Sequence, residues 1–151
     1  MTQAIIQIVT SFTGSIGFSL LFGLRGRQLP VAAIGSALTW SIYLAAEALG
    51  SGLFFANVLA SIFAGIYTEF FVRRLKVPKT VLTFSVLVSL IPGRALYNTM
   101  KYAIDGSWRE FAQSGMITVS VAAAIAIGVT IVLVGTQLIG KLEAAKRART
   151  K

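Results

Sequence analysis

Residues 91–97 read Ile91-Pro92-Gly93-Arg94-Ala95-Leu96-Tyr97, and this stretch places a helix break and a cation inside a segment that is otherwise apolar enough to cross a membrane. In hydrocarbon, a broken helix leaves backbone N–H and C=O groups without partners, and each unsatisfied group costs several kcal/mol. A guanidinium at the centre of a span adds roughly 2.5–3.5 kcal/mol. The sequence therefore predicts that the break is shielded by protein or faces water, as in the discontinuous helices of transporter binding sites.

The rest of the chain has the composition of a membrane protein. Of its 151 residues, 56% are apolar and 13% are charged. A transmembrane helix needs about 20 apolar residues, and four uncharged runs of the sequence are long enough, while a fifth and shorter run ends at the break. These runs predict an all-α integral membrane protein with five transmembrane helices, at about residues 4–24, 30–49, 53–72, 80–104 (the fourth, broken at Pro92-Gly93) and 111–140.

The five predicted spans occupy nearly the whole chain, so we expect a single membrane domain over residues 1–151 and no soluble catalytic domain. The chain contains no cysteine and no histidine, which removes thiolate metal sites and the commonest general base and metal ligand. No paired carboxylates lie mid-membrane to supply acid–base catalysis. We therefore expect no cofactor, no bound metal and no enzymatic activity.

The net charge of +9 is concentrated on one side of the predicted membrane. Eleven of the 14 basic residues follow the first, third and fifth spans, which end on the same side if successive spans alternate. Because cytoplasmic loops carry the excess of Lys and Arg, the N-terminus is predicted to lie outside and the C-terminus in the cytoplasm. This distribution argues against nucleic acid as a partner. Residues 141–151 are expected to form a basic cytoplasmic tail that contacts anionic lipid headgroups of the bilayer.

Arg94 is the leading candidate for a substrate-binding residue. A half-helix that begins after Pro92 and Gly93 would present free backbone N–H groups and the positive end of its dipole at the break. Arg94 adds a forked donor that suits a carboxylate, and Tyr97 and Asn98 on the next turn are further candidates. In the alternative interpretation, Arg94 snorkels to the outer interface and Tyr97 belongs to an aromatic belt.

Polar and small residues recur at every fourth position of the third predicted span, which predicts that this helix faces other helices or water. Asn57 and Ser61 are candidates to line a pore, although hydrogen bonding between helices is the commoner use of such residues. Glu69 is a candidate site for a proton or for the ammonium group of a substrate, with an ion pair to Arg73 at i,i+4 as the alternative. Glu47 is expected at the outer interface.

The odd number of spans bears on assembly. A second unit of the same kind placed in tandem would insert with the opposite orientation, and many secondary transporters are built from such inverted halves. We therefore expect this chain to form one half of an assembly, either with a second subunit or by self-association.

Three sequence features occur together in this chain. They are a basic turn after the first span, the segment Arg73-Arg74-Leu75-Lys76-Val77-Pro78 before the fourth, and Ile91-Pro92-Gly93-x-x-x-Tyr97 within it. This arrangement resembles the bacterial threonine/serine exporter family, and specifically its short membrane-only subunit, over nearly the full chain. The resemblance implies a multi-pass protein of the bacterial plasma membrane and a longer partner subunit with a cytosolic region. The His-Thr-Gly motif of that longer half is absent from this histidine-free chain.

The resemblance also implies a transported substrate. Members of the family are associated with export of threonine and serine, and related two-subunit systems with export of succinate. The leading interpretation is a secondary-transporter subunit for small carboxylate-bearing metabolites, driven by an ion or proton gradient because no Walker-type loop is present. A dicarboxylate exporter subunit and a non-transporting scaffold subunit are the alternatives, and an intramembrane enzyme is the weakest.

Overall fold

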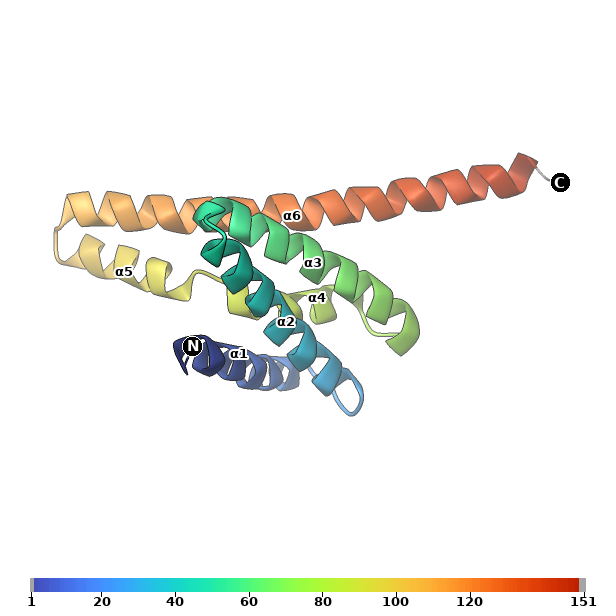
Figure 1. Cartoon of the computed structure of the whole chain (residues 1–151), viewed down its shortest axis with the longest axis horizontal. Coiled ribbons are helices and arrows are strands. Elements are labelled where there is room, and N and C mark those ends of the chain that lie inside the picture. Colours follow the sequence, from blue (N-terminus) through green and yellow to red (C-terminus); the bar gives the residue numbers. More distant parts are fainter. Residues whose placement is uncertain (1, 150–151) are drawn as a thin grey trace.

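The computed structural model describes residues 2–149, with side chains as far as Lys141, and this part of the chain is helical with short connections (Figure 1). Four helices are long and apolar enough to cross a membrane, and the bent pair Lys79–Leu90 and Gly93–Ile104 makes a fifth span if it is counted as one. The predicted all-α membrane architecture, with a break in its fourth apolar segment, is therefore confirmed. In chain order the elements are α1 (Thr2–Leu21), α2 (Gln28–Ala48), α3 (Gly52–Leu75), α4 (Lys79–Leu87), the 3₁₀ helix η1 (Val88–Leu90), α5 (Gly93–Ile104) and α6 (Trp108–Arg149).

The ends of α1 and α3 differ by a few residues from the expected spans, for local reasons. Helix α1 ends at Leu21 rather than near residue 24, because the turn that follows contains Gly23 and Gly26 with φ of 77° and 60°. Glycine adopts such left-handed conformations without a steric penalty. Helix α3 continues beyond residue 72 because Arg73 and Arg74 occupy its last turn, where their charges interact favourably with the helix dipole.

Helix α6 is much longer than the predicted fifth span. Its 42 residues correspond to about 63 Å at the α-helical rise, roughly twice the thickness of the hydrocarbon core. The helix continues from the span into the basic tail without a break and runs along most of the molecule in Figure 1. The side chains of residues 142–151 lie outside the described part of the chain, so their contact with headgroups stays a prediction.

Helix α3 is the centre of the packing. It contacts both α2 and α6, and the small residues expected at its interfaces are fully buried there: Ala56, Ala60, Ala64 and Thr68. The Ser61 Oγ donates to the Val58 carbonyl at 2.9 Å, so this hydroxyl is satisfied within its own helix. The expected use of the small-residue face for close helix packing is confirmed.

The turns that follow α1 and α3 lie toward the same end of the molecule as the C-terminal part of α6, on the right in Figure 1. The turn between α5 and α6 lies at the opposite end. The basic residues of the two turns therefore share one end of the fold, as alternating spans require. They are Arg25 and Arg27 in the first turn, and Arg73, Arg74, Lys76 and Lys79 in the second. Which side of the membrane this end occupies stays a prediction.

Candidate substrate site at the helix break

The fourth membrane segment is interrupted where the sequence predicts. Helix α4 tightens into η1, Ile91 leaves the helical region with φ −58° and ψ 125°, and α5 begins at Gly93. The residue before a proline avoids the helical conformation for steric reasons. The Gly93 N–H donates to the Ile91 carbonyl at 2.7 Å, which closes an inverse γ-turn centred on Pro92. As a result Lys79–Leu90 and Gly93–Ile104 are bent by 66° relative to each other.

A cavity of about 560 Å³ lies at this break. Its walls come from α1, α2, α3, η1, α5 and the first turns of α6. The interrupted backbone at Ile91 and Pro92 therefore adjoins an open space lined by protein. This arrangement is the one in which a helix break within a membrane is tolerated.

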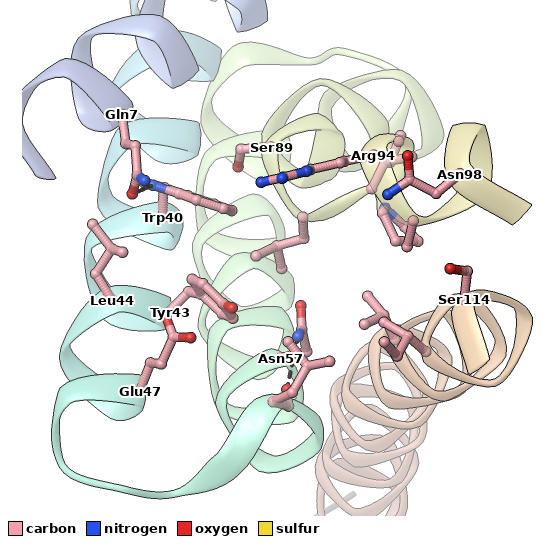
Figure 2. A pocket seen from close by; sticks show the side chains of 18 residues that line it. Gln7, Trp40, Tyr43, Leu44, Glu47, Asn57, Ser89, Arg94, Asn98 and Ser114 are labelled. Atoms are coloured by element: carbon pink, nitrogen blue, oxygen red, sulfur yellow. Dashed lines mark hydrogen bonds between the residues drawn. The ribbon is translucent and has the colours of Figure 1, made fainter. Parts of the chain in front are cut away.

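The structure brings some of the sequence-predicted residues together and separates others (Figure 2). Tyr97 is 67% exposed and does not line the cavity. Ser61 is buried between α3 and α6, also away from it. The predicted residues that do line the cavity are Pro92, Gly93, Arg94, Asn98 and Asn57.

Arg94 extends from the start of α5 toward Ser89 and Trp40 (Figure 2). It forms no ion pair with any residue whose side chain the structure describes. The N–H groups of the first turn of α5 have no carbonyl partner within the helix, and the positive end of the helix dipole lies at the same place. The structure thus places, at the edge of the cavity, a helix N-terminus and a guanidinium that no carboxylate of the described side chains neutralises.

Helix α2 contributes a group of lining residues that the sequence analysis did not assign to the site. Trp40, Tyr43 and Glu47 line the cavity from one face of this helix. The rings of Trp40 and Tyr43 stack with centroids 4.8 Å apart, and the Trp40 Nε1–H donates to the Gln7 Oε1 at 3.4 Å. The signal was present in the spacing, because residues three and four apart share a helix face.

Two uncharged polar side chains of the lining keep unused hydrogen-bonding capacity. Asn57 is 3% exposed and donates through Nδ2 to the Leu53 carbonyl at 2.8 Å, which leaves its Oδ1 as an acceptor. The Ser89 Oγ is buried and has no partner among the described residues. Buried polar groups are normally satisfied. The Asn57 Oδ1 can therefore accept from a polar ligand, whereas the Ser89 Oγ would become accessible only after its surroundings move.

Glu69 lies at the opposite end of α3 from the cavity. Its Oε1 accepts hydrogen bonds from the Arg73 Nε and Nη2 at 3.2 and 3.0 Å, and its Oε2 accepts one from the Lys79 Nζ. The ion pair between Glu69 and Arg73, which was the alternative interpretation of Glu69, is thus present in the structure. The sequence did not predict Lys79 as a second partner, and this contact links the end of α3 to the start of α4.

Comparisons with curated proteins and with solved structures found no match. A family model described as "Threonine/Serine exporter, ThrE" matches residues 7–134. The matched segment contains every residue that lines the cavity, from Gln7 to Val121. With its apolar helices and broken fourth span, this multi-pass membrane protein belongs to the threonine/serine exporter family and has an exporter-type transport function.

Proposed function

We propose that the chain is a subunit of a secondary transporter that exports small amino acids, threonine and serine foremost, across the bacterial plasma membrane. The observation that carries this proposal is Arg94, whose guanidinium lies on the cavity wall beside the N-terminus of α5 without an ion-pair partner among the side chains of residues 2–141. The guanidinium presents a planar fork of donors that matches the two oxygens of a carboxylate. Arg94 would hold the substrate carboxylate at the break in the fourth span.

The position of the cavity supports a defined transport state. Its lining comes from the start of α1, the end of α2 and the start of α3, and the basic turns lie at the other ends of these helices. With the basic turns in the cytoplasm, the cavity would open toward the outside. Exported substrate would leave from this outward-facing state, and an ion or proton gradient would drive the return.

The arrangement of α5 supports a second subunit. This helix packs mainly against α6 and buries no residue completely. Its large side chains Leu96, Tyr97 and Met100 are about half exposed or more. A partner half, either a longer subunit or a second copy of this chain, would cover this face and complete the cavity, as in transporters built from inverted halves.

The decisive experiment changes Arg94 and measures export of threonine and serine from cells that make the complete transporter. Arg94→Ala is expected to lower export about ten- to a hundredfold, because a charge-assisted hydrogen bond contributes roughly 1.5–3 kcal/mol. Arg94→Lys is expected to retain part of the activity, since it keeps the charge and loses the fork.

Arg109→Ala is the matched control, because Arg109 is an exposed cation at the start of α6 that does not line the cavity. The amount of each variant in the membrane is measured in parallel. Undiminished export by Arg94→Ala at normal abundance would contradict the proposed site.

A scaffold role is the second candidate, in which the exposed face of α5 would serve only to dock the partner subunit. In that case the partner would hold the whole site and Pro92 would serve only to kink the helix. Reconstitution of each subunit alone and of both together separates the two functions, because a scaffold variant of Arg94 would assemble and transport normally.

A further inference from the structure

We infer that Glu47 binds the ammonium group of the substrate and makes the cavity selective for zwitterions. This inference rests on the proposed function, in which Arg94 holds the carboxylate. Glu47 is a second charged residue of the site, and it belongs to α2 rather than to α5.

Two of the cavity-lining side chains that the structure describes are charged, and they have opposite signs. Arg94 comes from α5 and Glu47 from the end of α2, and neither forms an ion pair with a described residue. In Figure 2 the two side chains enter from different sides, and Tyr43 and Asn57 lie in the region between them. A ligand that carries one positive and one negative group would neutralise both charges at once.

The start of α5 reinforces this division of charge. Arg94 lies in the first turn of α5, where N–H groups without a partner in the helix give a partial positive charge. This helix end thus acts in the same sense as the Arg94 side chain. The Arg94 side of the cavity favours an anion, and the Glu47 side favours a cation.

The aromatic residue next to Glu47 suits the same ligand group. Tyr43 lies one turn before Glu47 on the cavity-facing side of α2, and ring faces attract ammonium ions. A dicarboxylate would place its second anionic group against Glu47, where it would be repelled. A dianion would need a second cation, and Arg94 is the one cation among the described lining residues.

The other carboxylates of the described side chains are differently placed. Glu69 is engaged by Arg73 and Lys79, while Asp105 and Glu110 lie outside the cavity lining. Glu110 is exposed at the start of α6, so Glu110→Gln removes the same charge without changing the cavity. It is the matched control for Glu47→Gln.

The test measures transport in membrane vesicles from the native host. Each variant is expressed from the natural position of the gene, and vesicles that lack the protein give the background. Four compounds compete for the site: threonine, 3-hydroxybutyrate (threonine without its amino group), 1-aminopropan-2-ol (threonine without its carboxylate) and succinate. The measured quantity is the ratio of apparent affinities for threonine and 3-hydroxybutyrate. A variant with a merely structural defect would bind both compounds more weakly and leave this ratio unchanged.

Wild type is expected to prefer threonine over the other three compounds. Glu47→Gln is expected to lower the apparent affinity for threonine about ten- to a hundredfold and to leave the affinity for 3-hydroxybutyrate unchanged. The preference for threonine would then be lost. Glu47→Asp should restore part of it, and Glu110→Gln should resemble wild type. Arg94→Gln should lower the affinity for both threonine and 3-hydroxybutyrate and leave the ratio of the two affinities unchanged.

A threonine preference that persists in Glu47→Gln overturns the inference and leaves the proposed function intact. A wild-type preference for succinate over threonine also overturns it, even if Glu47→Gln fails to fold, because this comparison needs no variant. If the wild-type protein transported none of the carboxylates, both the proposed function and the inference would be contradicted.

Discussion

Gly128 lies where α6 approaches α3 most tightly among the glycines of α6. A Cβ added at Gly128 would lie 2.8 Å from the Val58 carbonyl oxygen and 3.0 Å from the Ser61 Cβ. The same interface contains Gly65, whose added Cβ would lie 3.0 Å from the Val132 Cβ. Small residues at these points allow the two backbones to pack closely, which is the main source of helix association in a membrane.

Gly128→Ala is therefore expected to destabilise the fold by about 1–3 kcal/mol, because the contact with the Val58 carbonyl cannot be relieved by a side-chain rotation. The measurement is the thermal unfolding midpoint of the purified protein in detergent. Gly135→Ala is the matched control on the same helix, since nothing lies within 4 Å of its added Cβ. Equal stability of the two variants would show that α3 and α6 do not pack as described.

At the scale of the element, the break in the fourth span depends on Pro92 more than on Gly93. Pro92 has no N–H to donate and keeps Ile91 out of the helical conformation. Gly93 has no positive φ, and an added Cβ there would meet nothing within 4 Å. Pro92 therefore enforces the bend, whereas Gly93 can be replaced by alanine without a steric clash.

Pro92→Ala is expected to straighten the segment, since alanine restores both the donor and the helical freedom of Ile91. Spin labels on Phe84→Cys and Ile104→Cys, at exposed positions on either side of the break, would then move further apart than in the 66° bend. Gly93→Ala is the comparison variant and should keep the wild-type separation. An unchanged distance in Pro92→Ala would show that packing around η1, rather than the proline, holds the bend.

At the scale of the whole molecule, the basic turns share one end of the fold, and the cavity lies among the opposite ends of α1, α2 and α3. The positive-inside rule assigns the basic end to the cytoplasm. The direction in which the cavity opens follows from this assignment. The membrane orientation therefore decides whether the described conformation is the one that releases exported substrate.

The chain has no cysteine, so single cysteines report the orientation directly. Leu49→Cys, after α2, and Asp105→Cys, after α5, are expected to react with a membrane-impermeant maleimide in intact cells. Gln28→Cys, at the start of α2, is expected to react only after the cells are permeabilised. The reverse pattern would place the N-terminus in the cytoplasm and would invert the proposed transport state.

Local physics determined the spans, the break and the charge bias, and the sequence alone predicted all three. The length of an uncharged run sets whether a helix can cross the bilayer, and the effect of Pro92 on its neighbours needs no distant contact. The helix ends were less exact, as α6 shows, because nothing in a run of helix-forming residues marks where the membrane stops.

Only the tertiary structure decided which residues share the cavity. Glu47 and Trp40 are about 50 residues from Arg94 in the sequence, and they meet at one site because packing brings the end of α2 beside the start of α5. Packing also turns Tyr97 and Ser61 away from the cavity, although each lies within a turn of a residue that lines it. The rotation of a helix about its axis is set by contacts with its neighbours, and periodicity within one helix cannot determine it.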